Sequence, residues 1–172
     1  MHPRTLYALR DRGLIEPLSR GLYRLTALPP LGEPDLIAVT RKVPRGVVCL
    51  ISALVYHDLT TQIPHAVHLA LERGAERPRL DYPPVEVYWF SRPAFRAGIE
   101  EVEMDGVTVR IYDAEKTVAD CFKFRNRIGM DVTLEALRSW RARRERTVDR
   151  LLHYARVDRV ERVIWPYLEA LA

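Results

Sequence analysis

The sequence predicts an α+β protein in three parts: a helix with a hairpin, a strand-rich middle, and a helical C-terminal segment. Three observations support this prediction. A short helical pattern and two extended runs around a glycine occupy the first 28 residues. β-Branched and alternating runs dominate residues 47–112, and from residue 113 onward apolar side chains recur at helical spacing.

The N-terminal residues predict a short helix followed by a hairpin. The helix covers 3–12, with a proline in its first turn, Leu6 and Leu9 three residues apart, and Gly13 as its stop. Extended runs at 14–18 and 22–25 flank Ser19-Arg20-Gly21, which is typical of a hairpin turn. Residues 26–34 hold three prolines and a glycine and predict a linker. We therefore divide the chain into a unit of residues 1–28 and a domain of residues 29–172.

The middle of the chain begins with a predicted helix from Asp35 to Val43, which Pro44 ends. Residues 47–51 predict a short buried strand, and Ser52 is the expected N-cap of a helix through Leu59.

Two strands and a hairpin follow. The strands are Val67–Leu71 and Val85–Phe90, the second rich in β-branched and aromatic residues, with a polar exposed loop between them. Residues 99–112 predict a hairpin around Asp105-Gly106, the strongest short-range hairpin signal.

The C-terminal segment predicts several amphipathic helices. Asp113 is a good N-cap for a helix to about Arg125, and Leu134, Leu137 and Trp140 form the apolar stripe of the next. Further stripes lie within 148–155 and 160–168. We expect Leu137 and Trp140 to be core residues.

Composition favours a folded cytoplasmic protein. A chain of 172 residues that is 48% hydrophobic can bury a core. Cys49 and Cys121 lie in apolar stretches, as buried thiols of a reducing compartment do. No run approaches the roughly 18 apolar residues that span a bilayer, and the N-terminus lacks a signal-peptide pattern. We expect no membrane partner.

The chain is basic, and arginine provides most of the charge. It has 27 basic and 23 acidic residues, a net charge of +4, and only three lysines. The arginine surplus fits phosphate recognition by planar guanidinium groups, and equally a composition bias that favours arginine over lysine. Residues 1–28 carry five basic against two acidic residues, and residues 113–172 thirteen against ten. The positive charge therefore lies at the two ends.

We expect no catalytic residues, metal or cofactor. His65 and His68 are three apart, but their segment alternates like a strand, which places them on opposite faces, and no acid or cysteine completes a ligand set. His57-Asp58 could orient an imidazole, but neither a nucleophile nor a phosphate-binding glycine loop accompanies it.

One enzymatic alternative stays open, a metal-dependent nuclease built on the strand-rich middle. It would need Glu72, Glu86, Asp113 or Glu115 to converge with Lys116 in one cleft. Glu115 and Lys116 are adjacent, however, rather than separated by one residue as in the usual nuclease pattern. The simpler interpretation is helix capping, with Asp113 as N-cap and Glu115 in the first turn.

The first 25 residues carry the strongest functional pattern. A short helix that presents polar side chains beside its apolar face, followed by a hairpin with an arginine at its turn, is typical of a recognition helix and wing. The alternative is an ordinary helix–hairpin edge. The candidate DNA-binding residues are His2, Arg4, Thr5, Tyr7, Arg10 and Arg20.

Four separated motifs, in this order, resemble the AbiEi family of antitoxins from type IV toxin-antitoxin (abortive infection) systems. The motifs are RGLYRL at 20–25, LISALVYHDL at 50–59, KTVADCFKFRN at 116–126 and PYL at 166–168. The resemblance covers nearly the whole chain.

The resemblance implies an N-terminal winged helix-turn-helix that represses its own operon at inverted repeats of operator DNA. It also implies a C-terminal domain that neutralises a nucleotidyltransferase-like toxin without a stable complex. Within that domain we expect a possible antitoxin or nucleic-acid surface of basic residues, with a solvated helical face as the alternative. Its candidates are Lys116, Lys123, Arg125, Arg127, Arg138, Arg141 and Arg144.

The chain departs from this family at its start. A winged helix domain needs about three helices before its wing, and only one precedes the hairpin here. We therefore expect the 1–28 unit to be a partial winged helix-turn-helix, either because the start codon is placed too late or because the unit has degenerated. Both explanations weaken DNA binding by the chain.

Overall fold

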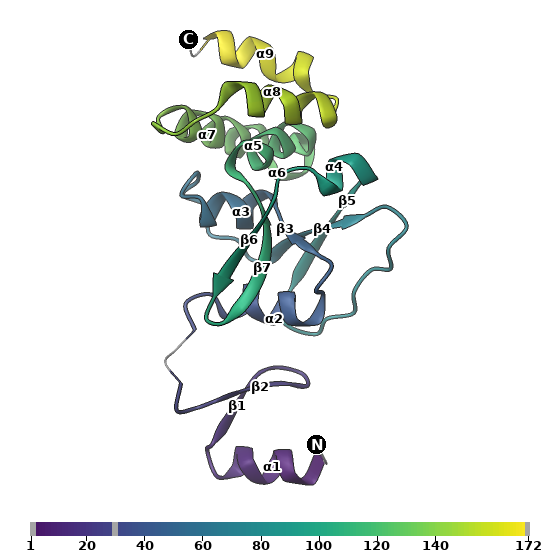
Figure 1. The fold of residues 1–172 in the computed structure, drawn as a ribbon, viewed down its shortest axis with the longest axis vertical. Helices are drawn as coiled ribbons and strands as arrows, with labels where there is room; N and C mark the ends of the chain where they lie inside the picture. The colour runs from purple at the N-terminus through teal and green to yellow at the C-terminus, as the bar shows by residue number, and fades with distance from the viewer. Residues whose placement is uncertain (1–2, 29–30, 171–172) are drawn as a thin grey trace.

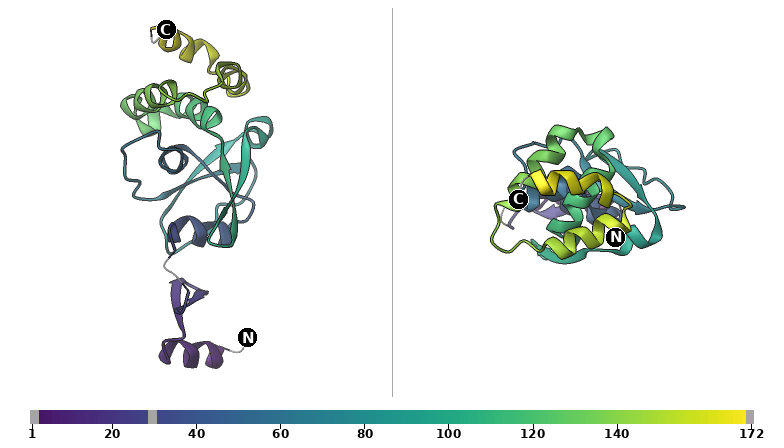
Figure 2. Two further views of the ribbon diagram at one scale, coloured as in Figure 1. Left: turned by 60° about the vertical axis from the view of Figure 1, so that its left-hand side comes forward. Right: turned by 90° about the horizontal axis from the view of Figure 1, so that it is seen from above.

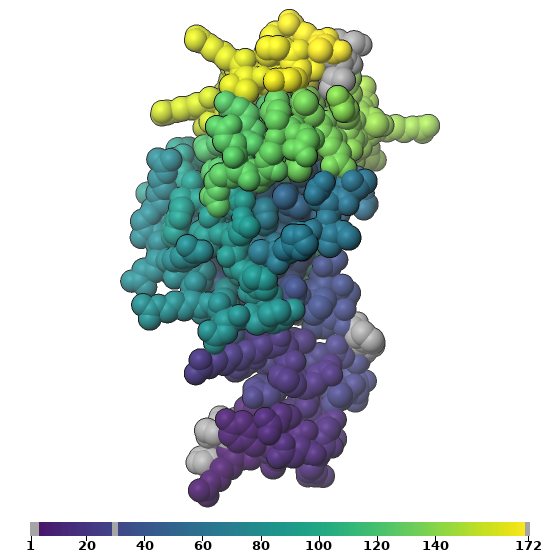
Figure 3. All heavy atoms as spheres, turned by 180° about the vertical axis from the view of Figure 1, so that it is seen from behind, coloured from purple at the N-terminus to yellow at the C-terminus, as the bar shows by residue number. Residues whose placement is uncertain are grey.

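The structure is a computed structural model that describes residues 3–28 and 31–170, and it has the predicted α+β architecture. A helix and hairpin, which we call the head (residues 3–28), lie at one end of an elongated molecule, a mixed sheet lies in the middle, and helices cover the other end (Figure 1). Figure 3 shows from behind that the head is a lobe at the end opposite α9 (Glu161–Ala170).

The head contains the helix and the hairpin that the sequence predicts. Its elements are α1 (Pro3–Asp11), β1 (Ile15–Ser19) and β2 (Leu22–Leu25). The two strands are antiparallel, with Ile15 opposite Leu25. Gly13 ends α1 in the left-handed region at φ +68°, where glycine has no steric penalty. Figure 2 shows the head projecting from the sheet.

A five-stranded mixed sheet forms the middle of the molecule, in the order β5-β4-β3-β7-β6. β3 pairs antiparallel with β4 and parallel with β7, β4 is parallel to β5, and β6 is antiparallel to β7. The strands are β3 (Val47–Val48), β4 (Val67–Glu72), β5 (Val85–Phe90), β6 (Ile99–Met104) and β7 (Val107–Tyr112). The β6–β7 hairpin turns at Asp105 and Gly106, both at positive φ, which confirms the predicted turn.

The segment after β3 differs from the prediction. The strand ends at Val48, and α3 (Leu50–Tyr56) begins at once, with Cys49 and not Ser52 as its N-cap. The Ser52 hydroxyl instead accepts a hydrogen bond from the buried backbone N–H of His68. A tertiary contact thus uses the side chain that local sequence assigns to capping.

Two apolar clusters cover the two faces of the sheet. On one face, Leu36 and Val39 of α2 (Pro34–Lys42) pack on Leu69, Val87 and their neighbours. On the other face, Tyr88 and Phe90 meet α3 and the C-terminal helices. The short α4 (Arg92–Arg96), which sequence analysis did not predict, leads from β5 to β6.

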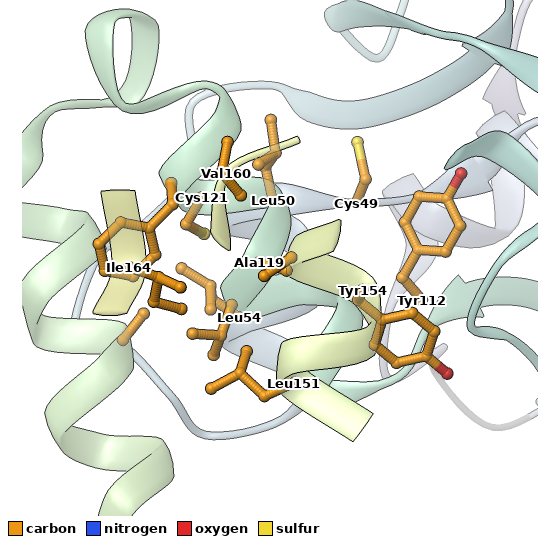
Figure 4. Packing of buried hydrophobic residues seen from close by; sticks show 14 of the residues in the cluster. Cys49, Leu50, Leu54, Tyr112, Ala119, Cys121, Leu151, Tyr154, Val160 and Ile164 are labelled. Atoms are coloured by element: carbon orange, nitrogen blue, oxygen red, sulfur yellow. The ribbon is translucent and has the colours of Figure 1, made fainter. Parts of the chain in front are cut away.

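The C-terminal helices pack on one another and on this second face. They are α5 (Ala114–Lys123), α6 (Arg125–Ile128), α7 (Met130–Arg141), α8 (Val148–Val157) and α9. Figure 4 shows Ala119 and Cys121 of α5 close to Leu151 of α8 and Ile164 of α9. Leu137 and Trp140 are fully buried, which confirms them as core residues.

In the part of the chain that the structure describes, no helix has the length and apolar character needed to cross a membrane.

Candidate functional site

The head presents one polar face of α1. Arg4, Tyr7 and Arg10 are spaced three residues apart, so they lie on the same side of the helix, and all three are exposed. Thr5 is also exposed, whereas Leu6 and Leu9 are half-buried. The candidate DNA-binding residues of α1 are therefore accessible, except that His2 lies outside the described residues.

Short-range contacts hold the arginine on this face. The Arg10 guanidinium pairs with Asp11 at 2.9 Å and lies 5.1 Å from the ring centroid of Tyr7. Such an exposed ion pair contributes little stability, so that a phosphate can compete for the guanidinium.

Arg20 lies at the turn of the hairpin, where a wing would meet DNA. Its Nη1 is 3.3 Å from Asp81 Oδ2, on the loop between β4 and β5. Both side chains are more than two-thirds exposed. This pair also ties the head to the body.

The head has little support of its own. Among residues 4–28 no hydrophobic side chain is buried, and α1 packs mainly on β1. Tyr7, Leu14, Leu25 and Leu28 are all large apolar side chains that remain about half exposed. The head therefore lacks the hydrophobic core that holds a recognition helix at a fixed angle.

The second candidate site is α5 with its N-cap, where the longest AbiEi-like motif lies. Asp113 caps α5 by accepting a hydrogen bond from the backbone N–H of Lys116 at 2.7 Å, as predicted. Its other oxygen accepts from Arg150 at 2.6 Å and from the Tyr154 hydroxyl at 2.7 Å. One carboxylate thus caps α5 and fastens α8 to it.

Glu115 makes a similar connection to α7. Its Oε1 accepts hydrogen bonds from the indole N–H of Trp140 and from the backbone N–H of Thr147, both at 3.1 Å. Glu115 is buried, so these donors replace the water that the carboxylate loses. The carboxylate joins α5 to α7 and to the start of α8.

Lys116 is fully buried, so its assignment to a basic surface is wrong. Its ammonium group donates to Asp120 on the next turn of α5 and to Asp158 Oδ2 at 3.3 Å, at the C-terminal end of α8. Lys123 Nζ lies 3.4 Å from the other oxygen of Asp158. Two cations and two anions balance inside the protein, and such pairing is what allows buried charge.

The charges of this network interact strongly. Burial lowers the pKa of Lys116, but attraction to Asp120 and Asp158 outweighs burial and keeps the pKa above its ordinary value. Burial raises the pKa of Asp120, and the negative charge of Asp158 raises it further against the effect of Lys116. We infer that Lys116 stays protonated and that its ammonium group is the common ion-pair partner of Asp120 and Asp158.

The surroundings of Lys116 are aromatic and tightly packed. Its Nζ lies 4.5 Å from the ring centroid of Tyr112 and 4.8 Å from that of Phe90. Gly98 passes so close that a Cβ there would lie 2.6 Å from the Lys116 Cβ, and its φ is +72°. Lys116 is therefore enclosed and does not reach solvent.

This geometry bears on the nuclease alternative. Asp113 and Glu115 line one polar cleft of about 190 Å³ together with His57, but Lys116 is turned into the core. Glu72 lies near Arg92, 3.8 Å away, and Glu86 accepts a hydrogen bond from Tyr88. The acids therefore do not converge with the lysine, and capping and helix packing account for Asp113 and Glu115.

The remaining candidate basic residues lie in two places, on α5 and α6 and on α7 with the loop after it. Lys123 and Arg125 are half-buried, and Arg125 donates to the Phe122 carbonyl at 2.7 Å. Arg127 is exposed but lies 3.9 Å above the Tyr88 ring. Arg138 and Arg144 are exposed and Arg141 is half-buried, on α7 and the loop that follows it.

The two histidines of residues 65–68 lie in different surroundings. His65 is exposed in the segment before β4, whereas His68 is buried on β4 beside Tyr88. Within residues 3–28 and 31–170 no three His, Cys, Asp or Glu residues gather in a group that could hold a metal ion.

Sequence reasoning missed the partners of the α5 motif. Asp158 lies 42 residues after Lys116, and Arg150 lies 37 residues after Asp113. No spacing rule connects residues so far apart. The available signal was the pair of opposite charges at Lys116 and Asp120, one turn apart on the predicted helix.

In comparisons with known proteins, no family model matches this chain, and no curated protein matches it. The AbiEi resemblance thus stays a prediction from the motifs.

Proposed function

We propose that this chain is a non-enzymatic DNA-binding regulator, the antitoxin of a type IV toxin-antitoxin pair that represses its own operon. It would counter a nucleotidyltransferase-like toxin without a stable complex. One observation carries the proposal: an exposed helix face with two arginines lies beside a hairpin whose turn carries a third, at one end of the molecule (Figure 2).

The head would contact DNA in two ways. Arg4, Tyr7 and Arg10 would face the major groove, where arginine reads guanine edges, and Arg20 would contact the phosphate backbone beside it. Because α1 rests on little besides β1, we expect weak binding by this chain alone.

The test for DNA binding is fluorescence anisotropy with a labelled duplex from the region upstream of the chain's own operon. We expect affinity to fall steeply as salt rises from 50 to 200 mM, because each phosphate contact releases counterions. Arg4→Ala should reduce the preference for this duplex over a scrambled one, and Arg20→Ala should weaken binding to both alike.

The control is Arg144→Ala, which removes an exposed arginine at the other end of the chain. It should leave DNA affinity unchanged within about twofold, since Arg144 lies far from the head and adds at most one phosphate contact. No binding at 50 mM salt, or a loss caused by Arg144→Ala and not by Arg4→Ala, would rule out the head as the DNA-binding element.

Antitoxin activity needs a separate test. Cells that express the nucleotidyltransferase-like protein of the same operon should stop growing, and co-expression of this chain should restore growth. We expect Arg138→Ala/Arg144→Ala to reduce this protection and Arg4→Ala/Arg10→Ala to retain it. If the chain gives no protection, the antitoxin assignment fails even if DNA binding is confirmed.

A further inference from the structure

A small cavity lies between the N-terminal end of α2, the C-terminal end of α3 and residues 64–67. Its volume is about 180 Å³. Sites for cofactors and drug-sized ligands are usually about 300–1,000 Å³, so this cavity has room for a single long side chain.

The cavity combines apolar walls with an acidic mouth. Leu36, Val55 and Val67 line it, while Glu33 and Asp35 stand at the start of α2. No hydrogen bond or ion pair joins either carboxylate to another of the described residues, and Glu33 does not cap the helix with its side chain. These two charges are available to a ligand.

The balance of charge favours a cation. The N-terminus of a helix carries about half a positive charge, whereas Glu33 and Asp35 together carry two negative ones. The local field is therefore negative, although the chain as a whole is at +4. The half-exposed ring of Tyr56 offers a face to a cation, and its edge contact with His57 helps to hold it.

The segment that leads into residues 64–67 is held in place by α7. Glu135 of α7 accepts hydrogen bonds from the Thr61 N–H at 2.7 Å and from the hydroxyls of Thr60 and Thr61. Two residues later, Ile63 is 83% exposed, the most exposed large apolar side chain among the described residues. An apolar side chain beside a cation would find a partner there.

We propose that this cavity is a docking pocket for a lysine or arginine side chain of a partner protein. The alkyl stem would lie along Leu36 and Val67, the cation would meet Glu33, Asp35 and Tyr56, and a neighbouring apolar residue would cover Ile63. The proposal is independent of the proposed DNA-binding and antitoxin function.

The first experiment titrates the full chain with Nα-acetyl-arginine methylamide and follows backbone amide signals by NMR. The citrulline derivative, a neutral molecule of the same shape, is the comparison. We expect saturable shifts at Tyr56 and Val67, with a Kd on the order of 1–10 mM. The citrulline derivative should bind at least about threefold more weakly. Equal binding of the two, or shifts spread over the whole chain, would overturn the proposal.

Variants of the two acidic residues test whether their carboxylates bind the arginine. Glu33→Gln and Asp35→Asn should each weaken arginine binding by about threefold. Asp149→Asn is the matched control, because Asp149 also lies in the first turn of a helix, on α8 away from the cavity. An equal effect of Asp149→Asn would show only general attraction to acidic residues and would contradict the pocket.

A third experiment distinguishes a protein partner from a free polyamine as the ligand of the cavity. Acetyl-Leu-Arg-methylamide should bind about threefold more tightly than acetyl-Gly-Arg-methylamide, and Ile63→Ser should abolish the difference. Spermidine that binds as tightly as the leucyl peptide, with no effect of Ile63→Ser, would contradict a protein partner.

Discussion

At the scale of single residues, the polar side chains of α5 serve to join helices. Asp113 holds α8 through Arg150 and Tyr154, and Glu115 holds α7 through Trp140. Lys116 contributes a cation that connects α5 to the C-terminal end of α8 through Asp158. Asp113, Glu115 and Lys116 are buried, so the loss of a partner leaves each of them without water to replace it.

We predict that Lys116→Met destabilises the protein by about 3–5 kcal/mol, because it leaves Asp120 and Asp158 buried with less positive charge. Urea unfolding followed by circular dichroism measures this change. The double variant Lys116→Met/Asp120→Leu should recover part of the loss, since it removes a charge from each side. A loss below about 1 kcal/mol in the single variant would show that the ion pair does little for stability.

Acid should weaken the contact that Glu135 makes with residues 60–61. Hydrogen bonds from the backbone and hydroxyl of Thr61, and from Thr60, lower the pKa of Glu135 below its ordinary value of 4.5. A carboxyl whose folded pKa is lowered stabilises the fold above that ordinary value, and the stability is lost as pH falls through the folded pKa.

The measurement is the free energy of unfolding between pH 6 and pH 3. We predict that wild type loses more stability than Glu135→Gln as pH falls below about 4.5, because only the wild type has this proton to take up. The control Glu76→Gln, in the exposed loop after β4, should follow the wild-type curve. Parallel curves for wild type and Glu135→Gln would contradict the assignment.

At the scale of elements, the sequence predicted correctly those turns, caps and helices that depend on residues close together in the chain. The Asp105-Gly106 turn, the Asp113 cap and the apolar stripe through Leu137 and Trp140 form where expected. The prediction of Ser52 as an N-cap was wrong because a neighbouring strand takes its hydroxyl. The fully buried position of Lys116 was also missed, since its second counter-ion, Asp158, belongs to another helix.

The packing of α7 rests on Trp140, which is both buried and hydrogen-bonded. We predict that Trp140→Ala costs about 3–5 kcal/mol, as a large-to-small core change does. Arg144 lies four residues further along the chain and is exposed. The free energy of unfolding of Arg144→Ala should therefore stay within about 0.5 kcal/mol of the wild-type value. Thermal and urea unfolding measure both. An unchanged melting temperature for Trp140→Ala would show that α7 does not depend on this contact.

At the scale of the whole molecule, the head and the body differ in what holds them together. Every buried hydrophobic residue among those described lies between Leu36 and Leu168, so the body contains the hydrophobic core. The exposed positions of Arg4, Thr5, Tyr7, Arg10 and Arg20 were predictable because each lies on one short helix or turn. The cavity beside α2 was not, because its walls come from three segments that only the fold brings together.

We therefore predict that removal of residues 1–28 changes the melting temperature of the body by no more than about 3 °C. For a domain of this size about 1 kcal/mol corresponds to 2–4 °C, and the head meets the body through exposed interactions such as the Arg20–Asp81 pair, which stabilise weakly. In the full chain, the amides of α1 and β2 should exchange with deuterium far faster than those of β4 and α5, because local opening exposes almost no apolar surface. Differential scanning calorimetry measures the change in melting temperature, and hydrogen exchange measures the protection of the amides. A drop of more than about 10 °C, or protection of α1 equal to that of α5, would show that the head is part of one cooperative core with the sheet.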